Sequence, residues 1–233
     1  MDTEGEVREA VVQAPFKGGY SIFLEGPAGA GKTTLAVQRL RYLLEQGVPG
    51  DTVLVLTPQR TLGLPYRRLI TSLDLPGGSE ITLATVGGLA RRTIDLFWPL
   101  VAAEVGFDPL RRPVFLTLET AQYYMDRALR EFLEKRYFDG IAIRRNRLAS
   151  QILDNLNKAA VVGFPITEIA ARLQGAWRGE PARLRAYDQV QECALAFRAY
   201  CLAHNLLDFS LQIEVFFQHL LPRPEGQDYL FGR

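Results

Sequence analysis

The sequence predicts an α/β fold in which a parallel sheet carries a phosphate-binding loop and a mostly α-helical segment is inserted after it. Three observations lead to this prediction. The first is the spacing G-x-x-x-x-G-K-[ST] at residues 26–33, which is typical of a phosphate-binding P-loop. The second is the alternation of short apolar runs with helical patterns up to about residue 97. The third is the helical spacing of apolar residues beyond that point.

The loop is the most informative stretch of the chain. It reads Gly26-Pro27-Ala28-Gly29-Ala30-Gly31-Lys32-Thr33-Thr34, and all nine residues are predicted to bind nucleotide. Glycine and alanine let successive backbone N–H groups face the phosphates, and the N-terminus of the next helix favours the same negative charge. Lys32 is expected to neutralise the β- and γ-phosphates, and the Thr33 hydroxyl to bind Mg²⁺. Lys32 and Thr33 are therefore the predicted catalytic residues.

The elements around the loop alternate in type. Buried strands are predicted at residues 20–24, 52–56 and 81–85, and helices at 35–44, from about 64 to 73, and from 87 onward. This rhythm indicates a doubly wound parallel sheet with its ligand at the carboxyl ends of the strands.

Five later segments show helical spacing without a predicted strand between them: 118–138, 148–162, 166–173, 182–202 and 211–221. The prediction therefore has three regions. Residues 1–97 form the first part of the phosphate-binding domain, 98–205 a helical insert, and 206–233 a return toward the first domain.

Composition narrows the class of protein. The chain has 233 residues and a formal net charge of +1, which excludes a globally basic nucleic-acid coat. Cys193 and Cys201 fit no zinc-binding spacing and are predicted to be buried free thiols. The N-terminus lacks the pattern of a signal peptide, and no apolar run approaches the roughly 20 residues that span a bilayer. We therefore expect a cytoplasmic protein without a membrane partner.

Three segments together resemble one family. The loop at 26–34, the strand end Leu56-Thr57-Pro58-Gln59-Arg60 and the segment at 83–90 resemble motifs I, Ia and Ib of the UvrD/Rep-type superfamily 1 DNA helicases. The resemblance implies a RecA-like first domain with a helical insert and a return to the sheet through residues 206–212. It also implies ATP and Mg²⁺ as cofactors, with hydrolysis coupled to movement on single-stranded DNA. The implied DNA-binding residues are Thr57, Thr85, Gly87, Arg91 and Arg92.

Several positions differ from the family pattern. Val7 stands where an adenine-reading Gln is usual, with Gln13 nearby but out of register, so discrimination between ATP and GTP is expected to be weak. Pro58 replaces a common Asn, and Gly87 replaces a His that often contacts DNA. DNA contacts are therefore expected to rely on backbone N–H groups and on Thr57 and Thr85.

The resemblance also predicts what should follow the chain. A P-loop enzyme needs a second acidic motif, an apolar strand that ends in Asp. The resemblance implies that this Walker B strand lies beyond residue 233, together with a second domain and its arginine finger. We therefore expect the N-terminal part of a larger helicase, which binds ATP without hydrolysing it. The missing central strand would leave an apolar slot in the sheet, so we expect the chain either to be poorly stable or to bury that slot by self-association. Asp208 is the first alternative acid if turnover occurs.

Two other classes of function fit the loop. One is a small-molecule kinase, in which Arg144, Arg145 and Arg147 would form a lid, and the other is a nucleotide-dependent binding module without catalysis. The same three arginines could instead grip DNA phosphates, but solvation or pairing with nearby carboxylates is the ordinary role of such a cluster.

Overall fold

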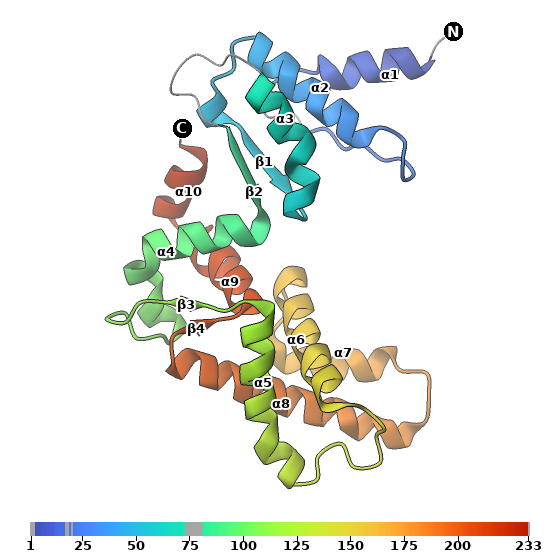
Figure 1. The fold of residues 1–233 in the computed structure, drawn as a ribbon, viewed down its shortest axis with the longest axis vertical. Helices are drawn as coiled ribbons and strands as arrows, with labels where there is room; N and C mark the ends of the chain where they lie inside the picture. The colour runs from blue at the N-terminus through green and yellow to red at the C-terminus, as the bar shows by residue number, and fades with distance from the viewer. Residues whose placement is uncertain (1–2, 17–18, 20, 73–80, 233) are drawn as a thin grey trace. The chain divides into compact units, whose positions relative to one another are not determined.

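The computed structural model describes residues 3–16, 19, 21–72 and 81–232, and it divides into two compact units. Unit 1 holds the residues up to Val86, and unit 2 runs from Gly87 to Gly232. Helices dominate both units (Figure 1). Across the described residues, no helix is long and apolar enough to cross a lipid bilayer.

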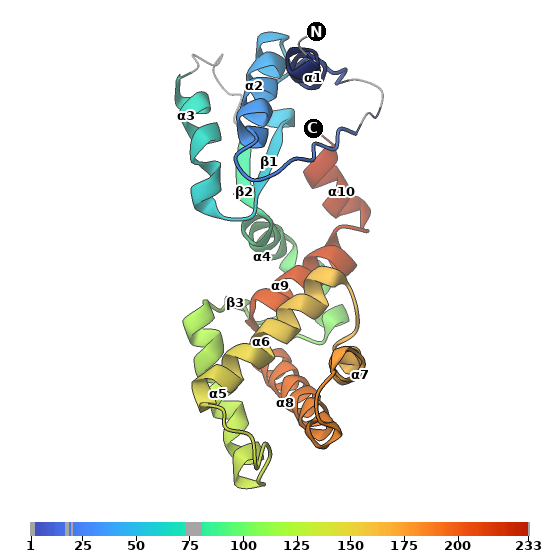
Figure 2. The same cartoon turned by 90° about the vertical axis from the view of Figure 1, so that its right-hand side faces the viewer.

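Unit 1 is built on a short parallel strand pair. β1 (Leu54–Thr57) pairs with β2 (Thr82–Thr85) in a register that runs from Leu54 opposite Thr82 to Thr57 opposite Thr85. Its other elements are α1 (Thr3–Val12), α2 (Lys32–Glu45), α3 (Leu64–Ser72) and the 3₁₀ turns Gly50–Thr52 and Arg60–Gly63. α2 packs against both α1 and α3 (Figures 1 and 2). The loop at residues 26–31 leads directly into α2.

The prediction of a RecA-like parallel sheet is wrong, because the described residues form only two sheets of two strands each. Two of its three expected strands form and pair in parallel, but residues 21–27 have no regular secondary structure. Tyr20 lies outside the described residues. Ile22 and Phe23 are 43% and 89% exposed, whereas a central parallel strand is covered on both faces and paired on both edges. No described strand pairs with residues 21–27, so this segment adds no strand to the β1–β2 pair.

Unit 2 is almost entirely helical. Its core lies where α5, α6, α8 and α9 meet, around fully buried side chains such as Met125, Ile152, Phe197 and Leu211. Its α-helices are α4 (Val86–Val105), α5 (Leu118–Glu134), α6 (Arg145–Val162), α7 (Ile169–Ala176), α8 (Leu184–Ala203), α9 (Phe209–Glu214) and α10 (Pro224–Phe231). Short 3₁₀ turns at Ile166–Glu168 and Pro181–Arg183 precede α7 and α8, and a π-helix, Val215–Leu220, follows α9.

A second strand pair inside unit 2 corrects the expected return to the first sheet. β3 (Val114–Phe115) pairs in parallel with β4 (Leu206–Leu207), a strand of the same unit, and not with β1 or β2. The rest of the expected return segment, from Phe209 on, begins α9. The Asn205 side chain fixes this pairing, because its amide donates to the carbonyls of Asp108 (2.7 Å) and Arg111 (2.9 Å). Strands of two residues are too short to show a period of two, which is why the sequence predicted none here.

Two further predictions concern the cysteines and the boundaries between the three regions. Cys193 and Cys201 are free and buried in α8, which confirms their predicted state. Burial raises the pKa of the Cys193 thiol to about 12 and also raises that of Cys201. The three-region division at residues 97 and 205 stays a prediction.

Candidate nucleotide-binding site

Two glycines give the loop its shape. Gly29 has φ 84° and Gly31 has φ 80°, the left-handed region that L side chains rarely adopt. A Cβ at either position would meet no neighbour within 4 Å, so backbone conformation and not crowding requires glycine here. Gly31 is the N-cap of α2, and Lys32 is the first residue of that helix.

The loop presents unused backbone donors. The Ala30 N–H donates to the Pro27 carbonyl (3.3 Å), whereas the N–H groups of Gly29 and Gly31 donate to no other described residue. The first N–H groups of α2 have no partner within the helix, and no acidic side chain lies in its first turn. Exposed donors at the N-terminus of a fourteen-residue helix form a suitable site for a phosphate group.

The Lys32 side chain folds back over the loop. Its ammonium donates to the carbonyls of Gly26 (2.5 Å) and Pro27 (2.6 Å), so the cation lies beside the exposed backbone donors. Phosphate oxygens are stronger acceptors than neutral carbonyls, because the bond then joins two charges. Lys32 is thus placed to exchange its carbonyl partners for a phosphate.

The next residue, Thr33, is exposed at the same helix end. The described residues contain no cluster of three or more His, Cys, Asp or Glu side chains that could hold a metal ion. A hydroxyl oxygen fits Mg²⁺, which is commonly held by few protein ligands together with phosphate oxygens and water. The loop therefore fits a Mg²⁺ ion that arrives with the nucleotide.

Arg39 is a residue that the sequence analysis missed. From the middle of α2 its guanidinium donates to the carbonyls of Val11 (3.0 Å), Val12 (3.2 Å), Ala14 (3.0 Å) and Pro15 (3.3 Å). These carbonyls lie at the end of α1 and just after it, where a helix carries a partial negative charge. Arg39 therefore fastens α1 and residues 11–15 to the helix that begins at the loop. An arginine half-way along an amphipathic helix is normally expected to be solvated or to pair with an acid one turn away. Arg39 has no acid one turn away, and this is the only sequence signal that could have indicated a structural role.

Val7, which stands where the family has its adenine-reading Gln, and Gln13, the nearby alternative, lie on α1 and directly after it. Val7 lies on α1 and is 55% exposed. The Gln13 amide donates to the Glu9 carboxylate at 3.1 Å, an exposed contact between residues four apart. Both residues belong to the segment that Arg39 holds against α2.

The predicted DNA-binding threonines lie side by side. Thr57 and Thr85 are opposite each other at the carboxyl ends of β1 and β2. Thr57 is only 7% exposed, and its hydroxyl donates to the Gln59 carbonyl (3.0 Å). Thr85 is half-buried. A DNA contact by Thr57 would therefore require its hydroxyl to accept a second bond.

The other predicted DNA-binding residues lie in the first turns of α4, in unit 2. A Cβ on Gly87 would approach the Phe209 ring to 3.0 Å, so the packing explains why a larger residue is disfavoured here. The Arg91 guanidinium lies 4.9 Å from the centre of the Phe115 ring, a cation–π geometry. Arg92 is exposed. Their roles in DNA binding stay predictions.

Comparison of the chain with models of protein families gave no match, and neither did comparison with curated proteins. The class of the site therefore rests on this chain's own residues: a glycine-shaped loop, a helix N-terminus and a lysine beside them.

Proposed function

We propose that residues 26–34 bind the phosphates of ATP together with Mg²⁺. The observation that carries this proposal is the conjunction of left-handed glycines at 29 and 31, unused backbone donors and the Lys32 ammonium at the start of α2. In this proposal the backbone of residues 29–33 cradles the phosphates, Lys32 neutralises them, and Thr33 provides a protein ligand to Mg²⁺.

We further propose that the chain is the ATP-binding part of a superfamily 1 DNA helicase or translocase. The support is the resemblance of residues 26–34, 56–60 and 83–90 to the family's motifs, and the side-by-side placement of Thr57 and Thr85 at the strand ends. In such a protein, ATP binding and single-stranded DNA binding are coupled, so each ligand changes the affinity for the other by the same factor.

Titration calorimetry with Mg·ATP tests the first proposal. Lys32→Ala should weaken binding at least about tenfold, because it removes a charge-assisted bond to phosphate. Lys158→Ala is the matched control, since the one interaction of Lys158 with another described side chain is an exposed ion pair with Asp154 on α6 in unit 2. Equal affinities of Lys32→Ala and wild type for Mg·ATP would contradict the proposal.

A second titration tests the helicase proposal. The affinity of the chain for single-stranded DNA is measured with and without a non-hydrolysable ATP analogue that saturates the loop. The proposal predicts a change of about fivefold or more, the size of a typical coupling between sites. An unchanged DNA affinity would leave a nucleotide-binding protein without this coupling and would contradict the helicase proposal.

A further inference from the structure

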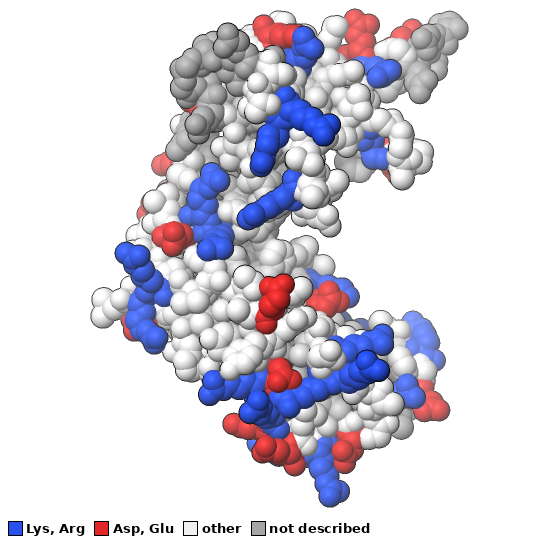
Figure 3. All heavy atoms as spheres, viewed as in Figure 1, with Lys and Arg blue, Asp and Glu red and all other residues white. Residues whose placement is uncertain are grey.

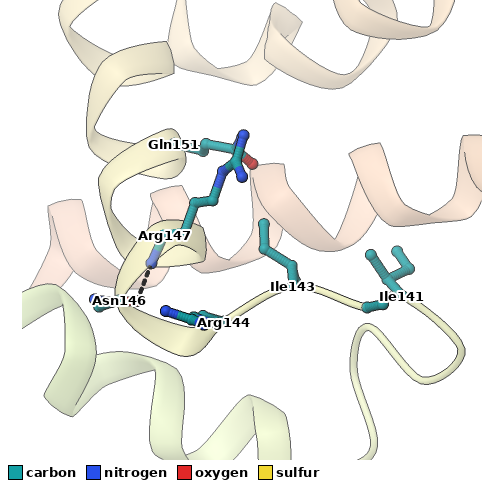
Figure 4. A pocket seen from close by; sticks show the side chains of 7 residues that line it. Ile141, Ile143, Arg144, Asn146, Arg147 and Gln151 are labelled. Atoms are coloured by element: carbon teal, nitrogen blue, oxygen red, sulfur yellow. Dashed lines mark hydrogen bonds between the residues drawn. The ribbon is translucent and has the colours of Figure 1, made fainter.

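Two adjoining hollows in unit 2 lie along the connection between α5 and α6. The first, about 700 Å³, is lined by residues 141–144 of the connection and by Asn146, Arg147 and Gln151 on α6. Figure 4 shows Ile141 and Ile143 on the connection, with Arg144, Arg147 and Gln151 at the start of the helix. The second, about 590 Å³, lies between residues 135–141 and residues 180–189. Ile141 lines both, and we call the pair the basic hollows.

The basic hollows carry more positive charge than their carboxylates neutralise. Their lining includes six basic side chains, Lys135, Arg136, Arg144, Arg147, Arg183 and Arg185, against two acidic ones, Asp139 and Glu180. Among the described residues, only Arg183 of these six makes an ion pair, at 4.0 Å from Glu180. Figure 3 shows Lys and Arg side chains gathered on the visible face of this unit, with Asp and Glu side chains among them.

Arg145, which lies in the same stretch of sequence as Arg144 and Arg147, has a structural role. Its guanidinium donates to the Asp126 carbonyl (2.5 Å) and carboxylate (2.9 Å), so it joins the start of α6 to α5. Arg144 and Arg147 flank it in sequence but line the first hollow, and no described carboxylate pairs with them. The three arginines that looked alike in the sequence therefore divide into one structural residue and two residues that face a hollow.

The connection that carries these charges is held firmly. Phe138 is buried, and its N–H donates to the Gln189 side chain at 2.9 Å. The Tyr137 hydroxyl donates to the Glu192 carboxylate on α8. Arg136 (φ 61°) and Phe138 (φ 65°) adopt left-handed backbone, which persists only where the surrounding packing imposes it. A ligand would thus meet basic groups whose backbone is already placed.

The chemistry of the lining points to one kind of ligand. Guanidinium groups bind phosphate by paired hydrogen bonds, and the N-terminus of α6 adds a partial positive charge beside Arg144 and Arg147. Half-buried Ile141 and Ile143 offer apolar surface to the faces of bases, and Asn146 and Gln151 offer amides to base edges. A concave surface admits bases that are splayed out of a strand, whereas in a duplex the bases are stacked inside.

We propose that the basic hollows bind single-stranded nucleic acid, with phosphates on Arg144, Arg147, Arg183 and Arg185 and bases against Ile141 and Ile143. This site belongs to unit 2, whereas the loop at residues 26–34 and the threonines Thr57 and Thr85 belong to unit 1, and its occupation by a single strand requires no bound nucleotide. Its test therefore uses no ATP, so its failure and a failure of nucleotide binding are distinguishable.

Fluorescence anisotropy of a labelled single-stranded DNA oligonucleotide, titrated with the 233-residue chain at several salt concentrations, tests the proposal. Arg144→Gln/Arg147→Gln should weaken binding about tenfold at low salt and reduce the slope of log K against log salt by about 1.4, since each lost phosphate contact on a single strand contributes about 0.7. Arg144→Lys/Arg147→Lys keeps the charge and should keep most of the slope. Arg8→Gln/Arg112→Gln removes the same charge at exposed positions elsewhere and should change neither quantity.

Three outcomes would overturn the proposal. The first is an equal effect of the Arg144/Arg147 and Arg8/Arg112 variants. The second is tighter binding of a duplex than of the single strand. The third is full displacement of the oligonucleotide by inorganic phosphate at constant ionic strength, which would indicate a small phosphate-bearing ligand. Photo-cross-linking of the bound strand gives an independent readout: cross-linked peptides from residues 135–151 support the proposal, and cross-links confined to unit 1 contradict it.

Discussion

Replacement of Arg39 by methionine tests how unit 1 holds α1 beside the loop helix. The Arg39 guanidinium contacts four carbonyls, but three of them lie on one nitrogen, Nη1, which carries only two hydrogens. Arg39 therefore makes two full hydrogen bonds, one from each terminal nitrogen, and two weaker ones in which two carbonyls share one hydrogen of Nη1. A hydrogen bond to a charged group contributes about 1.5–3 kcal/mol, and partial exposure of Arg39 reduces this because water replaces some of the loss. We expect a loss of about 2 kcal/mol.

The loss should be local, because the carbonyls belong to residues 11–15 and not to the core of unit 2. Hydrogen exchange of the amides in residues 3–12 should accelerate about 30-fold, which corresponds to 2 kcal/mol at 1.4 kcal/mol per factor of ten. Arg41→Met is the matched control on the same helix, since Arg41 makes only an exposed ion pair with Glu45 and contributes about 0.3–0.5 kcal/mol. The reasoning would be refuted if both variants accelerated exchange of α1 equally.

Three further predictions concern an acid, a thiol and the base of the nucleotide. Asp208→Ala should lower the free energy of unfolding by about 2–3 kcal/mol in a urea titration, because Asp208 is the N-cap of α9 and accepts a hydrogen bond from buried Ser210. The same substitution should leave Mg·ATP binding unchanged. A loss of Mg·ATP binding at unchanged stability would instead make Asp208 a residue of the site. Ellman's reagent should not modify Cys193 in the native chain at pH 8, because burial raises the pKa of this thiol to about 12. The raised pKa should also make the chain less stable as the pH rises from about 9 toward 12, because in this window only the thiol of the unfolded chain ionises. Rapid modification of the native chain would contradict this reasoning. The affinities for ATP and GTP, measured by calorimetry, should differ by no more than about tenfold, because the Val7 side chain cannot hydrogen-bond a base edge. A much larger preference for ATP would mean that another residue recognises adenine, and Gln13 is the first to test.

Much of the local structure followed from sequence pattern. The helix predicted at 35–44 lies within α2 (Lys32–Glu45), and the strands at 52–56 and 81–85 overlap β1 and β2. The β1 strand begins two residues later than predicted, because Gly50–Thr52 form a 3₁₀ turn. These elements were predictable because helical spacing and β-branched runs are local signals.

The errors arose where structure depends on a distant partner. Residues 20–24 have the composition of a buried strand, yet a strand forms only where it pairs with a neighbour, and no described strand pairs with residues 21–24. β3 and β4 depend on the Asn205 side chain, which is 97 and 94 residues from the two carbonyls that it binds, and no local pattern reports such a contact. The roles of Arg39 and Arg145 depend in the same way on carbonyls and carboxylates of other segments.

The most direct test of the central claim, that the loop binds phosphate, is the amide spectrum of ¹⁵N-labelled chain during titration with Mg·ATP. The account predicts that the largest shifts occur at Gly29, Gly31, Lys32 and Thr33, whose N–H groups would turn from solvent to phosphate oxygens, and that the same titration of Lys32→Ala leaves these shifts small at equal ligand concentration. Large shifts elsewhere with unchanged resonances for these four residues would contradict the claim.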